Sequence, residues 1–563
     1  MKPNMWSWLA AIGISVSAGL PSSSLAQQAG PEYQLFLAGD ELALCSSMAW
    51  QHCDDTNWID NTSMRTDRYL NLTDKYVKPL LADERWPQHR RETRDDVADA
   101  IVIIRNRLNE DIVPERVFLE EFTRRATRYL YDNLSEREWN LVVDHLEMPV
   151  PQGKTDTARL DELVLPAKRD ILEAFIRQAS LVKQAQSKDD KVPTIVIAAV
   201  GARDPFTAVE PFLSGFAQAG ANVQWLPLDA AVNTAQRTKQ CNELEALRET
   251  ELGTWHRARV HADKHRQQLE FCNSPLAGIK MIDQADGLFI VGNDPSLVRA
   301  ALLNPLSQPT DIMTSIYLKM KANRLVVGAT SDAMNALTAR AMVASGTSAE
   351  ALRSGAIAGE APPFACNKDD SCPRNMNQDS VSYHPLGGVG LFEFASLDGQ
   401  FSDLGRHGRL LSVAATTATP LAVGIDARTA LAVNVHSGAF TVLGERGVFF
   451  APAPQQVEHS VVSAFHYLTA GASGQFVDHD ISNVTFAKRD SVVQEDPTTR
   501  FLNKRGAVDS LRLICQQRDQ FNLIENEFRL MVIADDATQR QKSGGECQVM
   551  NARMGISWQP EKF

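Results

Sequence analysis

The sequence has no long apolar segment after its first 26 residues. An ordinary membrane-spanning helix needs about 20 consecutive apolar residues, and no later stretch approaches that length. An excess of basic residues is also missing, because 57 Lys and Arg stand against 69 Asp and Glu, a formal charge of -12. Nucleic acid and anionic membranes are therefore not expected as general partners. A cationic substrate is electrostatically acceptable.

The compositional bias of disordered chains is absent too, since 44% of the residues are hydrophobic and 22% are charged. A chain of 563 residues exceeds the length, roughly 250 to 300 residues, at which single domains usually stop growing. We therefore expect one main domain that carries large additions.

The first 26 residues have the pattern of a cleaved secretory signal. Lys2 precedes an apolar run over about 6–20, and Ser24-Leu25-Ala26 offers a small-x-small cleavage site. No Cys follows that site, which disfavours a lipid anchor there. The sequence predicts a soluble protein exported to a periplasm or to the extracellular space.

All eight cysteines follow this signal, and an even number favours disulfides in an exported protein. We predict that each cysteine pairs with its neighbour in sequence. A metal site at Cys366 and Cys372 is disfavoured, because C-N-K-D-D-S-C has neither a C-x-x-C pair nor a neighbouring His. No metal or cofactor is expected. The predicted bridges are Cys45 with Cys53, Cys241 with Cys272, Cys366 with Cys372, and Cys515 with Cys547.

Strand-like and helix-like segments alternate over residues 188–470. The run T-I-V-I-A-A-V at 194–200 is apolar throughout, which is typical of a strand covered on both faces. Further strands are predicted at 223–228, 287–291 and 325–327, with helical segments between them. This order predicts an α/β domain with a mostly parallel sheet flanked by helices, whose ligands bind at the carboxyl ends of the strands. After Gly388, short strands compatible with the same sheet predominate.

Three further segments flank or interrupt this domain. Residues 33–44 contain a short apolar segment that we assign to the first strand of the core. Residues 45–187 carry apolar side chains at helical spacing and a capping box of Ser135 and Glu138, and predict a helical insert. Residues 471–563 are interpreted as a C-terminal extension.

The stretch 324–334, R-L-V-V-G-A-T-S-D-A-M, predicts a buried strand that turns sharply into a helix over about 335–343. Ser331 would stand at the turn, where a hydroxyl rises above the strand ends and a helix N-terminus faces a developing oxyanion. Nucleophilic serines occupy such elbows. An ordinary crossover with Ser331 or Thr330 as a helix cap explains the same pattern.

Four segments, in order along the chain, resemble motifs of the cyanophycinase-like serine peptidases, relatives of aspartyl dipeptidase with a glutamine-amidotransferase-like core. Each is weak alone, but four in the right order are specific. They are Val291-Gly292-Asn293-Asp294 for the family's G-G-[DN]-Q turn, Ala329-Thr330-Ser331-Asp332-Ala333 for its G-T-S-A-G elbow, 398–409 for D-Q-H-F-x-x-R-x-R-x-x-R, and 424–431 for G-I-D-E-x-T-A-L.

The resemblance implies a serine exopeptidase that hydrolyses cyanophycin-like or β-aspartyl peptides. Ser331 would be the nucleophile, and the backbone N–H groups of Gly292 and Asp332 would hold the oxyanion. The resemblance further implies substrate-binding roles for Asp294, Asp398, Arg406 and Arg409.

The family's general base, however, is missing from this sequence. Its His falls at Gln400, and a carboxamide has no lone pair basic enough to take the serine proton at neutral pH. Asp294, Ala333 and Leu404 also depart from the family's pattern. The candidates for a replacement base are His384 and His407, followed by the weaker His436, His466 and His479.

Two interpretations from different functional classes stay open. The first is an exported peptidase with a rearranged base or a narrowed substrate. The second is a catalytically inactive relative that serves as a peptide-binding or scaffold protein. The discriminating feature is a basic side chain within about 3 Å of Ser331 Oγ. The assembly state is also open, a homodimer being one alternative.

Overall fold

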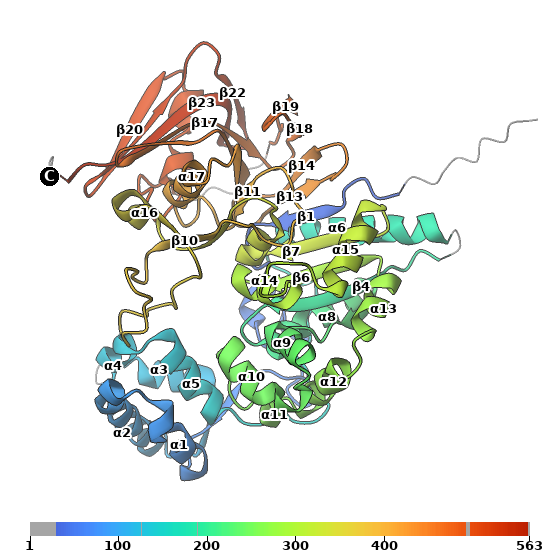
Figure 1. The fold of residues 1–563 in the computed structure, drawn as a ribbon, viewed down its shortest axis with the longest axis vertical. Coiled ribbons are helices and arrows are strands. Elements are labelled where there is room, and N and C mark those ends of the chain that lie inside the picture. The colour runs from blue at the N-terminus through green and yellow to red at the C-terminus, as the bar shows by residue number, and fades with distance from the viewer. Residues whose placement is uncertain (1–29, 125–126, 188–189, 491–495, 561–563) are drawn as a thin grey trace, which may run out of the picture.

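The computed structural model describes residues 30–124, 127–187, 190–490 and 496–560 (Figure 1). The predicted signal at 1–26 lies outside the described residues. The chain folds as a mixed α/β structure with several sheets and many helices. No helix within the described ranges is long and apolar enough to span a membrane.

A nine-stranded central sheet forms the middle of the molecule. Strands β5, β4, β6, β7 and β1 run parallel, whereas β13, β14, β18 and β19 continue the sheet in antiparallel fashion. The sheet is thus mixed rather than mostly parallel, because tight connections such as the one between β18 and β19 join only antiparallel neighbours. In spatial order the strands are β19 (Asp480–Thr485), β18 (Ser473–Val477), β14 (Ala439–Gly444), β13 (Thr429–Val433), β1 (Leu35–Ala38), β7 (Val326–Thr330), β6 (Gly287–Gly292), β4 (Thr194–Gly201) and β5 (Asn222–Trp225).

Helices cover both faces of the parallel half. Residues of β4 point alternately into two apolar cores: Ile195 and Ile197 pack with α6 and α8, and Val196 and Ala198 pack with the helices of the other face. This double burial explains the uninterrupted apolar run at 194–200. The covering helices are α6 (Pro166–Gln186) and α8 (Glu210–Gln218) on one face, and α9 (Ala230–Thr238), α13 (Ala277–Gln284), α14 (Pro295–Leu302) and α15 (Asp311–Lys321) on the other.

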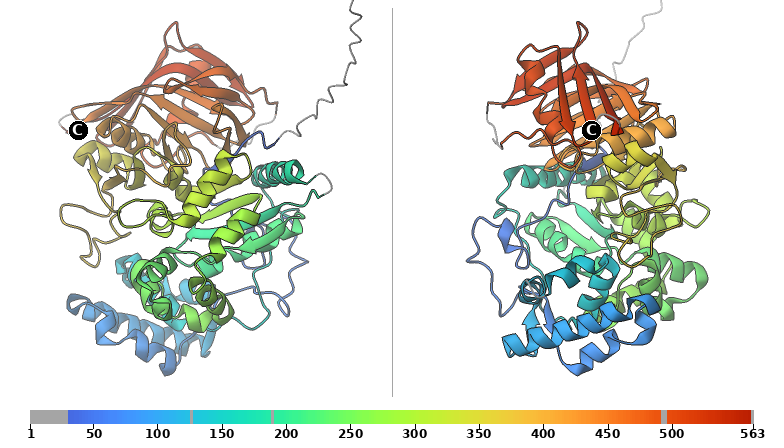
Figure 2. Two further views of the ribbon diagram at one scale, coloured as in Figure 1. Left: turned by 45° about the vertical axis from the view of Figure 1, so that its right-hand side comes forward. Right: turned by 90° about the vertical axis from the view of Figure 1, so that its left-hand side faces the viewer.

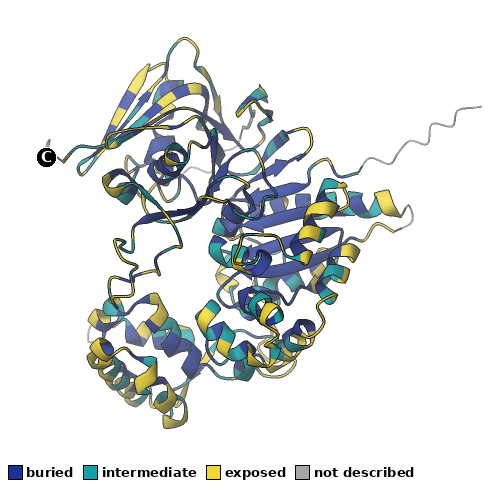
Figure 3. Cartoon of the chain, viewed as in Figure 1, coloured by how far each residue is buried: buried dark blue, intermediate teal, exposed yellow. Residues whose placement is uncertain are grey.

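A helical unit with a core of its own lies at one end of the molecule (Figures 1 and 2). The predicted capping box is present: Ser135 Oγ accepts from the Glu138 N–H, and Glu138 reaches back to the Ser135 N–H. The outer helix faces are exposed, as expected for amphipathic helices (Figure 3). The unit comprises α1 (Asp74–Leu80), α2 (Arg91–Leu108), α3 (Glu115–Phe122), α4 (Arg128–Asn133), α5 (Glu136–Leu146) and the strand pair β2 (Tyr69–Asn71) and β3 (Ile112–Pro114).

Buried ion pairs join this unit to the α/β part of the chain. Arg257, on α11 (Arg257–Val260), is fully buried and donates to Glu147 Oε2 and to Asp204 Oδ2, each over 2.7 Å. Burial disfavours its charge, but Glu147 and Asp204 hold the pKa of Arg257 above its ordinary value. A buried ion pair of this kind joins two parts of the fold only while each of its charges keeps an oppositely charged partner.

A second sheet holds most of the strands near the C-terminus, so the β-rich half does not simply extend the first sheet. Its inner face packs on α16 (Ser348–Ser354) and α17 (His407–Thr416). The region after position 471 is divided between the sheets, because β18 and β19 belong to the central one. The second sheet runs β11 (Ser396–Asp398), β12 (Leu421–Ile425), β15 (Gly447–Pro452), β17 (Ser460–Thr469), β23 (Glu546–Trp558), β21 (Phe528–Ile533) and β20 (Gln520–Glu525), with β16 (Gln455–Val457) and β22 (Gln539–Ser543) attached.

The four predicted disulfides are confirmed. Cys45 pairs with Cys53, Cys241 with Cys272, Cys366 with Cys372, and Cys515 with Cys547.

A small third sheet lies in the region that follows the elbow. It consists of β8 (Met342–Ser345), β10 (Val381–His384) and β9 (Ala356–Ala358).

Candidate active site

The serine elbow forms where β7 ends. Ser331 directly follows β7 and has a φ of 52°, the left-handed conformation that residues other than Gly rarely adopt. Its N–H donates to the carbonyl of Asp40 over 3.0 Å, which ties the turn to the loop after β1. The helix expected over about 335–343 is shorter and begins earlier: a 3-10 helix covers Ser331–Leu337, and β8 then occupies Met342–Ser345. The buried side chains of Met334 and Leu337 anchor this tight turn in the core.

Gln400 occupies the place expected of a general base. Its Nε2 donates to Ser331 Oγ over 2.9 Å. The Gln400 backbone is also left-handed, with a φ of 44°, and its N–H donates to the carbonyl of Gly39 over 2.6 Å. The carbonyl groups of Gly39 and Asp40 therefore position both members of the pair. Gly39 and Asp40 fall within the segment 33–44, for which the sequence predicts a core strand and no role in the site.

A carboxamide in this position supports no proton transfer from serine. The Gln400 amide donates a hydrogen bond to the hydroxyl but has no basic lone pair to receive a proton. Ser331 itself has no solvent-exposed surface. The hydroxyl is therefore both unactivated and covered.

The histidines considered as replacement bases lie elsewhere. His407 is buried between the rings of Phe401 and Phe449, at centroid distances of 4.5 and 5.1 Å, and burial lowers its pKa to about 4. His384, on β10, faces Glu360 Oε2 at 3.3 Å in a pocket of about 280 Å³ beside α9 and α14. No histidine hydrogen-bonds to Ser331 among the residues that the structure describes. The weaker candidates His436 and His466 bond to Asn323 and Asp480, and His479 lies at the tip of a hairpin.

Three of the charged residues predicted to bind substrate, Asp398, Arg406 and Arg409, form ion pairs with one another and with Asp332. Asp398 is fully buried and accepts from Arg409 Nε over 2.8 Å and from Arg409 Nη2. Arg406 donates to both carboxylate oxygens of Asp332 and lies 3.4 Å from Asp398. Burial disfavours the charge of Arg409, but the Asp398 carboxylate holds its pKa above the ordinary value. Two cations and two anions thus form a compensated network beside the elbow.

The glycine turn after β6 has a structural explanation. Gly292 has a φ of 135°, and a Cβ there would lie 2.0 Å from the carbonyl carbon of Gly201. Asp294 caps α14, because its Oδ1 accepts from the N–H groups of Ser296 and Leu297 over 2.8 and 3.3 Å. Burial raises the pKa of Asp294, and the Asp332 carboxylate raises it further. Asp294 is therefore a helix cap whose carboxylate is also repelled by the Asp332 carboxylate in the elbow.

Comparisons with known proteins give a distant likeness. No model of a known protein family matches the chain. Among solved structures, a peptidase from an acI-B1 Actinobacterium is similar over 57% of this chain and 94% of that chain, with 14% sequence identity and a TM-score of 0.26. At that TM-score the likeness does not bear on the chemistry of Ser331, which rests on the geometry above.

Proposed function

We propose that this chain is an exported, non-hydrolytic relative of the cyanophycinase-like serine peptidases that acts as a peptide-binding or scaffold protein. The observation that carries this proposal is the 2.9 Å hydrogen bond from Gln400 Nε2 to the buried Ser331 Oγ. Loss of the base from such a catalytic unit lowers kcat by a factor on the order of 10⁶. The four disulfides support the export part of the proposal, because disulfides persist in oxidising compartments.

Access to the serine argues in the same direction. Attack requires the hydroxyl oxygen to approach a carbonyl carbon to about 3 to 3.5 Å, and a side chain without exposed surface offers no such approach. The Asp332–Arg406 and Asp398–Arg409 pairs next to the elbow consist of charged groups that already compensate one another.

A hydrolase specific for cyanophycin-like or β-aspartyl peptides is the second candidate. The observation in its favour is the left-handed backbone of Ser331, with a φ of 52°, because strained conformations of this kind gather at functional sites. This candidate requires Gln400 to swing away and another base to approach Ser331.

Covalent labelling with a fluorophosphonate probe separates the two candidates. We expect no Ser331-dependent labelling of the wild-type chain, so that wild type and Ser331→Ala give the same signal. Gln400→His places an imidazole beside Oγ and separates the two obstacles: labelling of this variant would assign the inertness to the missing base alone, whereas no labelling would assign it to the cover over Ser331 as well. Gln517→His is the matched control, since Gln517 is an exposed glutamine that is also left-handed, with a φ of 67°. His is among the residues enriched in that conformation.

Wild-type labelling that disappears in Ser331→Ala and is blocked by cyanophycin or a β-aspartyl dipeptide would refute the non-hydrolytic proposal. Circular dichroism and thermal unfolding of each variant show whether a missing signal reflects chemistry or misfolding. Binding of the same peptides to the unlabelled wild-type chain, measured by calorimetry, distinguishes a peptide-binding protein from a scaffold.

A further inference from the structure

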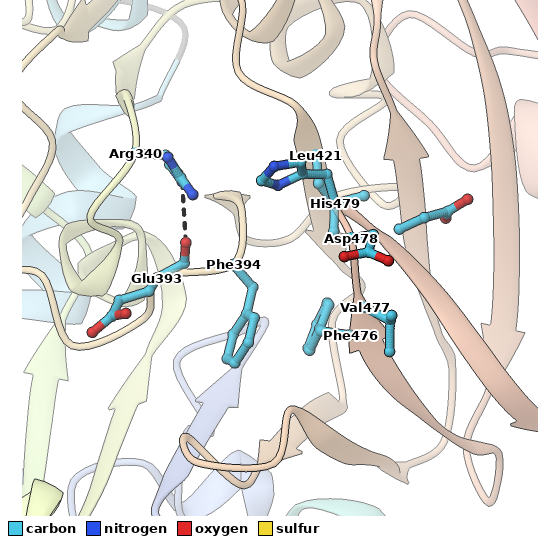
Figure 4. Close-up of a pocket in the computed structure, with 9 residues that line it drawn as sticks. Arg340, Glu393, Phe394, Leu421, Phe476, Val477, Asp478 and His479 are labelled. Carbon is cyan, nitrogen blue, oxygen red and sulfur yellow. Dashed lines mark hydrogen bonds between the residues drawn. The ribbon is translucent and has the colours of Figure 1, made fainter.

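A pocket of about 320 Å³, separate from the Ser331 elbow, lies beside the β18–β19 hairpin (Figure 4). The hairpin has a two-residue loop, since Val477 pairs with Asp480. The loop residues Asp478 and His479 both have positive φ, 49° and 69°, as a tight turn between twisted strands requires. This turn presents Asp478 at the rim of the pocket.

The floor of the pocket is aromatic. The rings of Phe394 and Phe476 stack with their centroids 4.7 Å apart and their planes 13° from parallel. Leu421 adds a further apolar surface. In Figure 4 the two rings lie below Arg340, Asp478 and His479, whereas Leu421 lies beside His479. This arrangement suits a ligand with one apolar and one charged end.

One wall of the pocket is anionic. His466 Nδ1 accepts from the Asn551 N–H over 3.0 Å, and Nε2 of the same ring donates to Asp480 Oδ1 over 2.8 Å. Burial raises the pKa of Asp480, but the hydrogen bond and charge interaction with His466 and the hydrogen bond from the Ile481 N–H together lower it below its ordinary value. Asp480 therefore stays a full anion. Asp478, the neighbouring carboxylate, has no ion-pair partner in the described part of the chain.

The opposite wall is cationic. Arg340 Nε donates to the carbonyl of Glu393 over 3.1 Å, which orients the guanidinium (Figure 4). Its two terminal amino groups have no acceptor among the described residues, and a guanidinium fork matches a carboxylate. The Glu393 carboxylate does not compete for Arg340, because it lies 2.9 Å from Lys321 Nζ.

We propose that this pocket binds an aromatic α-amino acid in its zwitterionic form. The ammonium group lies against Asp478 and Asp480, the carboxylate against Arg340, and the ring packs on Phe394 and Phe476. A volume of about 320 Å³ is near the lower end of ligand pockets and suits a molecule of this size. An amine without a carboxylate leaves Arg340 unpaired, and an acid without an ammonium leaves two carboxylates facing the ligand.

Isothermal titration calorimetry of the full chain with three probes tests the proposal. L-Phenylalanine carries both charged groups, phenethylamine lacks the carboxylate, and hydrocinnamate lacks the ammonium. We expect saturable binding of L-phenylalanine and at least about tenfold weaker binding of each analogue, as the loss of a charge-assisted hydrogen bond implies. No saturable heat with L-phenylalanine at millimolar concentration would overturn the proposal, as would equal binding of all three probes.

Two variants test which wall of the pocket contacts the carboxylate of the ligand and which contacts its ammonium group. Arg340→Gln is expected to weaken L-phenylalanine and leave phenethylamine unchanged, and Asp478→Asn is expected to weaken both. Asn tolerates positive φ, so the hairpin turn is kept. Asp536→Asn is the matched control, because Asp536 is an exposed carboxylate outside the pocket. An equal loss of affinity in Asp536→Asn and Asp478→Asn would refute the assignment, whereas Ser331→Ala should bind L-phenylalanine as the wild type does.

Discussion

Replacement of Asp398 by Asn tests whether the charge network beside the elbow is structural. Asp398 has 0% exposed surface, and its partner Arg409 is 5% exposed. Asn keeps the shape of the side chain but leaves the Arg409 charge buried without its main counterion. Removing one partner of a buried pair costs about 3 to 5 kcal/mol. Asp332 Oδ2 remains 3.8 Å from Arg409 and offsets part of the loss, so we expect about 3 kcal/mol.

Urea unfolding followed by circular dichroism gives the free energy of unfolding of each variant. A loss of about 3 kcal/mol is a large share of the roughly 5 to 15 kcal/mol that stabilises a folded domain, so the midpoint should fall clearly without abolishing the fold. The double variant Asp398→Leu/Arg409→Met removes both charges. Because apolar replacement of a buried pair is often neutral or stabilising, we expect the double variant to be more stable than Asp398→Asn.

The opposite pattern would refute this reasoning. If Asp398→Asn lowers the free energy of unfolding by less than about 1 kcal/mol, as an exposed substitution does, the network is not structural. If the same variant also loses affinity for a β-aspartyl peptide, Asp398 binds ligand. Asp536→Asn controls for the removal of one negative charge from the surface.

Three further perturbations have defined outcomes. Because the pKa of His407 is about 4 in the folded chain and about 6.5 in an unfolded one, its neutral form stabilises the fold above pH 6.5, and this contribution is lost as the pH falls toward 4. His407→Leu should therefore reduce the drop in unfolding free energy between neutral and acid pH by about 2 to 3 kcal/mol, measured by urea unfolding at both pH values; an unchanged drop would contradict the shift. Replacing Cys515 and Cys547 by Ala opens a loop with a sequence separation of 32, and in the chain-entropy model it should lower the free energy of unfolding by about 3 to 4 kcal/mol. The same replacement at Cys366 and Cys372, with a separation of 6, should lower it by roughly 2 kcal/mol. Equal losses in the two variants would count against that model. Gly292→Ala should fold poorly, because the new Cβ would lie 2.0 Å from Gly201, whereas Gly153→Ala, with positive φ but nothing within 4 Å, should lose only about 1 to 2 kcal/mol; similar melting temperatures for the two variants would exclude the steric explanation.

Local features of this protein were determined by its sequence alone. The doubly buried strand β4 follows from an apolar run with no polar face to expose, and the Ser135–Glu138 capping box follows from spacing within one helical turn. The disulfides could be predicted because each cysteine has its partner as neighbour in sequence. The missing base was equally visible, since no fold changes the chemistry of a carboxamide.

The partner of each side chain was decided only by the tertiary structure. Ser331 and Gln400 lie 69 positions apart, and their contact depends on backbone groups of Gly39 and Asp40 in the distant loop after β1. A sequence shows that Asp398 and Arg409 are charged, but whether they face a ligand or each other depends on which groups lose their water when distant segments pack. His407 became a core side chain for the same reason, because burial between Phe401 and Phe449 is a property of packing rather than of local sequence.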